Sequence, residues 1–433
     1  MVTDYPTKPV ECWPKMKELR KKHFFHIWNV QKEGGVLVMG TVQIFMGFLA
    51  GLGNFANANY APQFTRLMDD TKLAVRNHEA FEAKGYGREM CSAMRCHLGQ
   101  LYQGLSLKSP LGGEFRPDFI FDFSWCADTA KTAQLASEYL GIPYYIVDVP
   151  YKYNDQCIDY MVNQLHEAIE WLEKVTGRAY DDEKLIEAVN NEWECCVLWA
   201  KISELTKLIP APIDARHLNS LRLPSATSRH KEEVVQFHRM VYDEVLDRVK
   251  NGISARGFER KRLSLDTSSP FYFPQLLRWP EEYGSVIIGG QRFFDAFGAW
   301  EVKEDTLSWK VMKTPAERGL QLRTREDALR ALAELNVKYM PIQRIYDLTK
   351  EAEEYLQFVK DWKIDATTFA YDRGCKGYLS AGLPETALAM KRNGIPALSF
   401  DCSMADPRDF DEKSVKNKFD IFLESLGLTK LNA

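Results

Sequence analysis

Short apolar runs alternate with helical patterns in the first part of the chain. The apolar run Asp118–Phe123 predicts a strand, the pattern of Ala127–Leu140 predicts a helix, and Tyr144–Val147 predicts a second strand. Further upstream, Val36–Met39 predicts a buried strand. Because strands that alternate with helices pair in parallel through right-handed crossovers, we predict an α/β domain here.

The same alternation returns in the C-terminal part of the chain. A charged stretch from Trp300 to Arg323 interrupts it, and we expect this stretch to be a surface insertion. These elements together predict a second α/β domain. The predicted strands are Arg262–Asp266, Ser285–Ile288, Ile364–Ala370 and Ala397–Phe400, and the predicted helices are Pro274–Tyr283, Arg325–Leu335, Thr349–Trp362 and Pro384–Arg392.

Two further regions are predicted to be helical. The segment Val10–Gln31 has a helical pattern and forms an N-terminal arm. The spacing of apolar residues is also helical over Gln156–Leu208 and Lys231–Lys250, and the intervening Pro210–Arg229 has the composition of a connector. We therefore predict four units: a helical arm at 1–33, a first α/β domain at 34–155, a helical domain at 156–255 and a second α/β domain at 256–433.

The two α/β domains contain one unit twice. The unit is a strand, a cysteine, a helix, the tripeptide Gly-Ile-Pro, a second strand and an aspartate. This internal repeat predicts two tandem doubly wound parallel-sheet domains, flavodoxin-like or Rossmann-like in type. Its marker residues are Cys126, Gly141–Pro143 and Asp148 in the first domain and Cys375, Gly394–Pro396 and Asp401 in the second.

Charge and composition exclude several classes of protein. The 433 residues include 56 Lys and Arg against 60 Asp and Glu, and the basic residues do not gather in one half of the chain. Nucleic-acid binders need such a gathering to neutralise phosphates, so we expect no nucleic-acid partner. Nine cysteines at irregular spacing do not fit a secreted disulfide framework, and the N-terminus lacks the order of a signal peptide. We therefore expect a cytoplasmic protein.

One uncharged stretch, Gly34–Ala56, is long enough to cross a bilayer. Its six glycines and the polar residues Thr41, Gln43 and Asn54 oppose a membrane span. A buried strand followed by the start of a helix accounts for the same pattern. We therefore expect no membrane span.

Two cysteines occupy equivalent places in the repeated unit. Cys126 and Cys375 each follow the end of a predicted strand, and ligands of open α/β sheets bind beyond the carboxyl ends of the strands. If the two domains face each other, both thiols point into the crevice between them. Two thiolates there could hold zinc, form a redox pair or bind part of an iron–sulfur cluster.

A third thiol is expected near these two. Cys91 falls in the first turn of a predicted helix, where the helix dipole favours the thiolate, so it is the best third ligand. Cys96 lies about 140° further around that helix and is the alternative. The adjacent Cys195 and Cys196 lie in an apolar helical pattern and are expected to be core residues.

Five short motifs resemble those of a known family. They are Met90-Cys91-Ser92, Ser124-Trp125-Cys126-Ala127-Asp128, Arg373-Gly374-Cys375, Gly394-Ile395-Pro396 and the segment Ser399–Arg408. Together they resemble the 2-hydroxyacyl-CoA dehydratase and benzoyl-CoA reductase family over nearly the whole chain. The resemblance implies two α/β domains with a helical region, and a 4Fe-4S cluster that Cys91, Cys126 and Cys375 hold at the domain interface.

The resemblance also implies a function and partners. It implies an oxidoreductase, the larger catalytic subunit of an ATP-dependent benzoyl-CoA reductase, which reduces an aromatic acyl-CoA to a dienoyl-CoA by one-electron steps. The implied partners are a homologous smaller cluster-binding subunit and an iron–sulfur ATPase that passes on electrons from ferredoxin. The chain itself lacks the G-x-x-x-x-G-K-[ST] loop that binds nucleotide phosphates.

Three alternatives to this function remain open. Within the family, the chain could be a subunit of a radical 2-hydroxyacyl-CoA dehydratase, although Trp125 and Arg373 depart from the pattern of many dehydratase relatives. Outside the family, it could be a cysteine-ligated zinc protein or an electron-relay subunit without catalysis.

The pocket for the acyl-CoA substrate is expected in the loops that follow the strands. Phe293, Phe294 and Phe297, in a chain with 12% aromatic residues, suggest an apolar wall for an aromatic acyl group. Each candidate also has an ordinary interpretation as a loop, cap or core residue. The other candidates for substrate binding are Thr41, Gln43, Tyr151, Lys152, Thr267, Ser268, Ser269 and Gln291, and the candidate catalytic proton donors are His97, Asp148 and Asp372.

Overall fold

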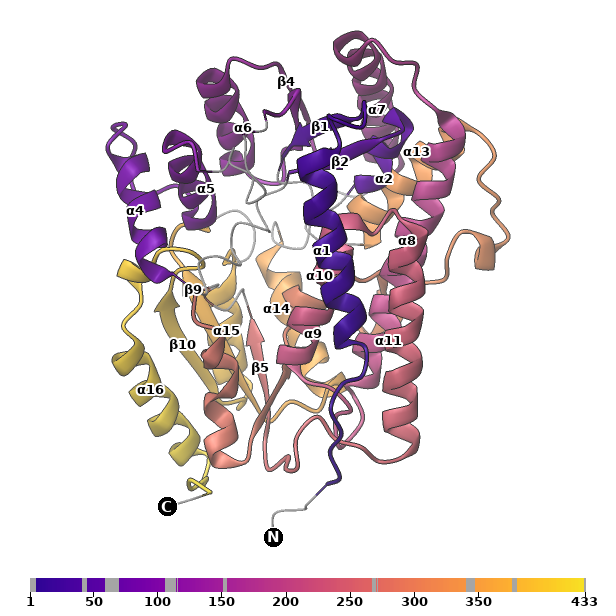
Figure 1. Ribbon diagram of the computed structural model, residues 1–433. Coiled ribbons are helices and arrows are strands. Elements are labelled where there is room, and N and C mark those ends of the chain that lie inside the picture. The colour runs from indigo at the N-terminus through magenta and orange to yellow at the C-terminus, as the bar shows by residue number, and fades with distance from the viewer. Residues whose placement is uncertain are drawn as a thin grey trace.

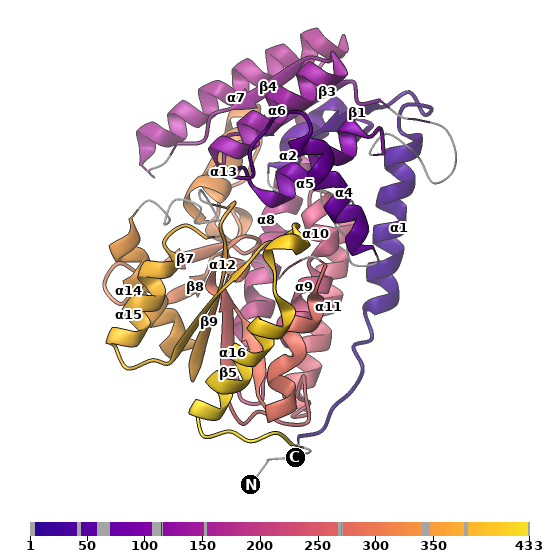
Figure 2. The same ribbon diagram turned by 90° about the vertical axis from the view of Figure 1, so that its left-hand side faces the viewer.

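The structure, a computed structural model, describes residues 5–40, 45–58, 70–105, 114, 116–150, 154–266, 270, 272–339, 347–375 and 380–431. Figure 1 shows two α/β units, one above the other, with long helices along one side. In the view turned by 90°, the helix α7 (Asp155–Thr176) lies across the top of the upper unit (Figure 2).

The first sheet is built from β1 (Val36–Met39), β2 (Phe55–Asn57), β3 (Phe119–Phe123) and β4 (Tyr144–Val147). Its strands are all parallel, in the order β2-β1-β3-β4. Every residue of β3 is buried, as expected for a strand that helices cover on both faces. The helix α6 (Ala127–Leu140) follows β3 and ends at Gly141, whose φ of 63° lies in the left-handed region that suits glycine.

The second sheet is built from β5 (Arg262–Asp266), β6 (Val286–Gly289), β9 (Ala366–Asp372) and β10 (Ala397–Cys402). Its strands are also parallel, in the order β10-β9-β5-β6. Numbered within each unit, both sheets have the strand order 2-1-3-4, so the repeat in the sequence is a repeat in topology. This order is flavodoxin-like, with its switch point between the first and third strands. The predicted fold class is confirmed.

Helices lie around both sheets (Figures 1 and 2). In the N-terminal half they are α1 (Trp13–Asn29), α2 (Met46–Leu49), η1 (Ala50–Leu52), α4 (Thr71–Glu82), α5 (Ser92–Tyr102), α6, α7, α8 (Asp182–Leu205), α9 (Ala215–Leu221), α10 (Leu223–Ser228) and α11 (Glu232–Lys250). In the C-terminal half they are η2 (Pro274–Tyr283), α12 (Gln291–Asp295), η3 (Ala316–Arg318), α13 (Arg325–Ala333), η4 (Glu334–Tyr339), α14 (Leu348–Asp361), α15 (Leu383–Arg392), η6 (Pro407–Asp409) and α16 (Glu412–Ser425). The boundaries between the four predicted units stay a prediction.

The helix α8 joins the two hydrophobic cores. Trp193 belongs to the core of the first sheet, and Trp199, further along the helix, belongs to the core of the second. Neither side chain is exposed to solvent. Truncation of a buried Trp to Ala costs about 3–5 kcal/mol, so each core holds its end of α8 firmly. The helix also packs against α11 along the right-hand side of Figure 1.

The uncharged stretch Gly34–Ala56 folds into β1, α2, η1 and β2 where the structure describes it. The two strands pair with each other in the first sheet, so the apolar side chains of this stretch lie against the protein interior. Within the described residues, no helix combines the length and the apolar character needed to span a membrane.

The connector expected over Pro210–Arg229 contains two short helices, α9 and α10. Asp214 caps the first of them, because its carboxylate accepts a hydrogen bond from the His217 N–H at 3.0 Å. The composition of the segment predicts turns, but part of it is helical because the Asp214 cap stabilises the first turn of α9.

The surface insertion expected over Trp300–Arg323 begins with a hairpin of β7 (Trp300–Val302) and β8 (Trp309–Val311). The tryptophans that begin the two strands are only 1% and 3% exposed. Both pack against the indole of Trp362 in the second unit. The expectation was therefore wrong for the hairpin, which belongs to the core because burial of two indoles outweighs the polar character of the segment.

Candidate metal centre and active site

Three cysteines lie around the interface between the two units. Cys91 is the N-cap residue of α5, and Cys126 is the N-cap residue of α6, shortly after β3. Cys375 follows β9, which is the third strand of the second unit. Helices between parallel strands begin at the carboxyl edge of the sheet, so all three thiols lie at the edge where such folds bind ligands.

The thiols of these cysteines approach one another. A hydrogen bond with the Cys375 thiol, together with burial and the charge of Asp372, raises the pKa of Cys91. Burial raises the pKa of Cys126, the Thr129 hydroxyl at 3.4 Å lowers it, and the Cys375 thiol raises it further. The Cys375 thiol of the second unit therefore interacts with two thiols of the first, by a hydrogen bond with Cys91 and electrostatically with Cys126.

The chemistry of this donor set suits an iron–sulfur cluster. Within the described residues, no three His, Cys, Asp or Glu side chains are placed to hold a single metal ion. A four-iron cluster is wider than one ion and takes thiolates as ligands. Because the pKa values of Cys91 and Cys126 are raised, these two thiols are protonated at neutral pH in the chain alone, and positively charged iron would convert them to thiolates.

Asp372 joins the loops that carry two of the cysteines. Its carboxylate accepts hydrogen bonds from the Ser92 hydroxyl at 3.0 Å, the Met404 N–H at 2.7 Å and the Gly374 N–H at 2.9 Å. Ser92 directly follows Cys91, so the first of these bonds crosses between the units. Burial raises the pKa of Asp372, and the three hydrogen bonds oppose that rise because they stabilise the carboxylate.

The backbones of the two units approach closely at Gly374. A Cβ atom there would lie 3.1 Å from the Met90 carbonyl oxygen and 3.1 Å from the Ser92 nitrogen. A side chain would push the loops apart, which explains the glycine before the third cysteine. On the other side of the site, the Asp128 carboxylate accepts a hydrogen bond from the Cys91 N–H at 3.0 Å and so links the starts of α5 and α6.

Asp406 fixes the loop that follows β10. Its fully buried side chain accepts hydrogen bonds from Arg95 of α5 at 3.2 Å and from Arg408 at 2.8 Å. Burial by itself would raise the pKa of Asp406, but the hydrogen bond from Arg408 and the interactions with His78 and Arg95 hold it well below its usual range. The motif Ser399–Arg408 is thus tied to the first unit.

The aspartates that end the repeated unit make equivalent contacts. In each unit, the residue two positions before the cysteine donates a hydrogen bond to this aspartate. Ser124 donates to Asp148 at 2.7 Å, and Arg373 donates to Asp401 at 3.2 Å. The side chains differ, but the positions agree, so the repeat extends to tertiary contacts.

The three predicted proton donors lie in different surroundings. His97 is 1% exposed, and burial lowers its pKa to about 3, so it is uncharged at neutral pH. Asp148 is exposed to solvent. Asp372 lies beside Cys91, whose pKa it raises. A catalytic role for each of the three stays a prediction.

The structure describes some of the predicted substrate-binding residues. Gln291 and Phe294 are buried residues of α12. The Phe294 ring stacks on Trp362 with 5.4 Å between centroids, and Phe293 packs against Trp199. Phe294 is part of the core of the second unit, and a substrate contact for any of the three stays a prediction. Thr41, Gln43, Tyr151, Lys152, Thr267, Ser268 and Ser269 lie outside the described residues.

Cys402 is a further thiol near the site. It ends β10 in register with Asp372 of β9, and burial, Asp372 and the Cys375 thiol are among the causes that raise its pKa. Its position directly after the aspartate that ends the repeated unit is the signal by which the sequence could have identified it. Cys96, the alternative third ligand, instead accepts a hydrogen bond from Asn77 at 3.3 Å.

A buried acidic cluster lies at the carboxyl end of β5. Asp266 ends this strand and accepts hydrogen bonds from the Tyr355 hydroxyl and, at 3.0 Å, from the Arg292 N–H. Glu351 precedes Tyr355 by one turn of α14 and forms an ion pair with the Arg292 guanidinium. Burial raises the pKa of Glu351 to about 7, although Arg292 opposes the rise. The residues of this cluster come from three separate elements, β5, α12 and α14, so no local sequence pattern indicates the cluster.

Comparison with known proteins identifies the family. The profile of the family described as 2-hydroxyglutaryl-CoA dehydratase, D-component, matches residues 58–426, which include all three cysteines of the candidate centre. The chain belongs to this family. The resemblance stated from the motifs is thereby confirmed.

Curated relatives of the chain include subunits of two kinds of enzyme. The (R)-phenyllactyl-CoA dehydratase alpha subunit of Clostridium sporogenes is 26% identical over 342 residues, which cover 77% of this chain and 76% of the relative. The (R)-2-hydroxyglutaryl-CoA dehydratase subunit alpha of Acidaminococcus fermentans is 24% identical over 66% of this chain, and the match spans 55% of that relative. A benzoyl-CoA reductase subunit of Thauera aromatica is 21% identical over 81% of this chain and 80% of the relative. The identities are thus higher with these two dehydratase subunits.

Proposed function

We propose that the chain is a catalytic subunit of a 2-hydroxyacyl-CoA dehydratase in which Cys91, Cys126 and Cys375 hold a 4Fe-4S cluster. The convergence of three thiols from two units, in a chain of the dehydratase D-component family, carries this proposal. With three thiolate ligands one iron stays open, so the bound cluster would supply a one-electron donor and a Lewis acid for a thioester carbonyl.

The relatives and the family description favour a dehydratase over the aromatic acyl-CoA reductase that the motifs implied. The relatives with higher identity are dehydratase subunits, and the family itself is described as a dehydratase component. Phe294, expected in the wall of an aromatic pocket, packs in the core of the second unit, which removes one reason for the aromatic substrate.

The chain's own residues would keep the site dry and fixed. Cys91 and Cys375 are each 6% exposed, and Tyr272 and Met404 pack in the same apolar cluster. Exclusion of water strengthens electrostatic interactions at the site and prevents side reactions of reactive species. The hydrogen bond from Ser92 to Asp372 joins the two units, and the bond from the Met404 N–H to Asp372 fixes the loop after β10, so the groups around a bound thioester would be preorganised.

The chain would act in the cytoplasm within a hetero-oligomer. The relatives are named as subunits, two of them as alpha subunits, which supports a homologous partner subunit that also binds a cluster. The chain has no phosphate-binding G-x-x-x-x-G-K-[ST] loop, which supports an external iron–sulfur ATPase, supplied by ferredoxin, as the source of electrons.

A subunit of benzoyl-CoA reductase is the second candidate. The benzoyl-CoA reductase subunit among the relatives and the aromatic content of 12% favour it. The two candidates differ in chemistry, because a dehydratase eliminates water from a 2-hydroxyacyl thioester whereas the reductase adds electrons and protons to an aromatic ring.

Metal analysis of the chain, purified without oxygen together with its partner subunit, tests the cluster. We expect iron and acid-labile sulfide in the wild type, and Cys375→Ser should lose the iron that this chain binds while the partner subunit keeps its own. Cys195→Ser is the matched control, because Cys195 is buried in α8, outside the three-thiol site, and this variant should keep its iron. Zinc in place of iron, or full iron retention in Cys375→Ser, would contradict the proposal.

The substrate is tested with the complete system of chain, partner and electron-donating ATPase. A 2-hydroxyacyl-CoA should yield an enoyl-CoA and water, and benzoyl-CoA should stay unchanged. Conversion of benzoyl-CoA to a dienoyl-CoA, without dehydration of the hydroxyacyl thioester, would select the second candidate.

A further inference from the structure

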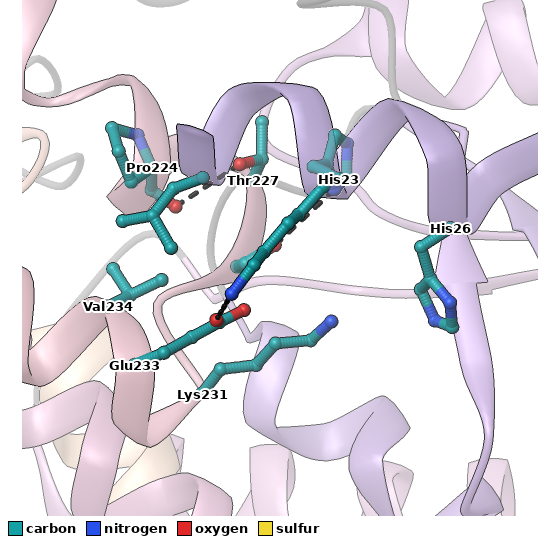
Figure 3. A pocket seen from close by; sticks show the side chains of 10 residues that line it. His23, His26, Pro224, Thr227, Lys231, Glu233 and Val234 are labelled. Carbon is teal, nitrogen blue, oxygen red and sulfur yellow. Dashed lines mark hydrogen bonds and ion pairs between the residues drawn. The ribbon is translucent and has the colours of Figure 1, made fainter. Parts of the chain in front are cut away.

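A cavity of about 220 Å³ lies between α1, α10 and the start of α11 (Figure 3). It is separate from the candidate metal centre, which is built from other elements. Its α1 wall, Trp13–Asn29, precedes residue 58, where the family match begins. One side of the cavity therefore lies outside the part of the chain that defines the family.

Positive charge predominates in the lining of the cavity. Lys22 pairs with Glu233 at 3.1 Å and with Glu18 at 3.2 Å, whereas Lys231 has no ion-pair partner among the residues that the structure describes. In Figure 3 the Lys231 ammonium group points toward the side of the cavity that carries His26. Burial lowers the pKa of Lys231, Glu233 opposes this change and Lys22 adds to it, as expected for a cation without a counterion.

His23 and the start of α11 add hydrogen-bond donors. His23 is 7% exposed, and its Nε2 atom has no hydrogen-bond partner in the described part of the chain. Its Nδ1 atom lies 3.3 Å from the Ser228 hydroxyl, and when Ser228 donates to Nδ1, Nε2 carries the ring proton. No side chain caps the N-terminus of α11, whose backbone N–H groups are suited to an anion.

The same residues do not suit a metal cation. His23, His26 and Glu233 are of types that bind metals, but the described residues contain no three such side chains placed around one ion. The unpaired Lys231 ammonium would also repel a cation. The volume of about 220 Å³ far exceeds the space that one water molecule needs, so a polyatomic anion fits.

We propose that this cavity binds a phosphate-type oxyanion, which is either inorganic phosphate or the phosphate group of a larger molecule. Lys231 supplies the charge that pairs with the anion, and His23 and the start of α11 donate hydrogen bonds. Lys22 compensates the negative charge of Glu233 in the lining, so that this carboxylate does not repel the anion. The anion links the N-terminal arm to the helical region. This site is independent of the chemistry proposed at the cysteines.

Calorimetric titration of the full chain with inorganic phosphate, at constant ionic strength, tests the site. We expect saturable binding by the wild type and an affinity about tenfold weaker in Lys231→Gln. Lys250→Gln is the matched control, because it removes the same charge from the exposed last turn of the same helix, and it should bind like the wild type. Absence of binding at about 10 mM phosphate, or equal affinities of the two variants, would overturn the proposal.

A second variant and a second ligand complete the test. Lys22→Gln changes a half-exposed side chain, so the variant should fold even if Lys231→Gln does not, and it should also weaken binding. If Lys22→Gln and the wild type bind phosphate equally, the proposal fails. Competition by coenzyme A, which carries a phosphate monoester, would assign the site to the phosphate of a larger molecule. Phosphate binding without this competition would assign it to the free ion.

Discussion

Replacement of Asp406 by asparagine tests how the loop after β10 is held against the first unit. The carboxylate accepts hydrogen bonds from Arg95 at 3.2 Å and from Arg408 at 2.8 and 2.9 Å. The Arg95 side chain is 2% exposed and that of Asp406 is not exposed. Asparagine keeps the shape of the side chain but removes its charge and turns one acceptor atom into a donor.

The expected loss of free energy of unfolding depends on which carboxylates still face Arg95 in the variant. Removing one partner of a buried ion pair costs about 3–5 kcal/mol, because the other charge stays buried without compensation. Here Glu82 lies 3.6 Å from Arg95 and 2.6 Å from Arg408 and still offers a carboxylate. We therefore expect the free energy of unfolding of Asp406→Asn to fall by about 2–4 kcal/mol at neutral pH.

The same variant should show a defined pH dependence. The folded-state pKa of Asp406 is held below its ordinary value of 3.8, so its stabilising contribution is complete above that value and is lost as the pH falls below it. The difference between wild type and Asp406→Asn should therefore shrink in acid. Urea unfolding at several pH values measures this difference.

Asp401→Asn is the control for this experiment. Asp401 pairs with Arg373, and the two side chains are 57% and 77% exposed, so its loss should change the free energy of unfolding by less than about 1 kcal/mol. The reasoning is refuted if Asp406→Asn destabilises the chain no more than this control at neutral pH. The Met404 N–H, on the same loop, is bonded to Asp372, so Asp406→Asn should also lower iron retention.

Three further predictions concern other positions. Arg229→Met leaves the buried Glu192 carboxylate without its arginine, and urea unfolding should show a loss of about 3–5 kcal/mol that Glu192→Gln partly restores in the double variant. Gly374→Ala places a Cβ atom 3.1 Å from backbone atoms of the first unit, so metal analysis should show less iron than in the wild type with little change in helical content. The pKa of Glu351 is raised from 4.5 to about 7, so its ionisation lowers the free energy of unfolding as the pH rises between these values. Over that range Glu351→Gln should gain stability relative to the wild type. If the free energies of unfolding of the two proteins change in parallel with pH, this prediction is wrong.

Two strands and a helix of the first α/β unit could be predicted closely from the sequence. The strands β1 and β4 and the helix α6 have the predicted bounds. The fully buried β1 is a continuous apolar run, and the helix ends at a glycine. The meeting of the cysteines could also be expected, since strand ends and helix starts share one edge of a sheet.

Contacts between distant residues could not be predicted in the same way. Ser92 and Asp372 are 280 residues apart, and Asp266 and Tyr355 are 89 apart, so no local period marks either pair. The buried tryptophans of the β7–β8 hairpin lie among charged residues, and only tertiary packing against Trp362 shows that they are interior. Local patterns record the burial of an element but not the partner that buries it.

The two α/β units differ at the helix that precedes their third strand. In the first unit this helix is α5, and its N-cap residue is Cys91. In the second unit it is α14, and its N-cap residue is Asp347, whose carboxylate accepts a hydrogen bond from the Lys350 N–H at 3.1 Å. A perfectly symmetric duplicate would bring two thiols from each unit, and four thiols would saturate a four-iron cluster. In the proposed centre, the broken symmetry at this one position is what leaves an iron accessible to a substrate, so the reactivity would arise from the divergence of the two copies rather than from their likeness.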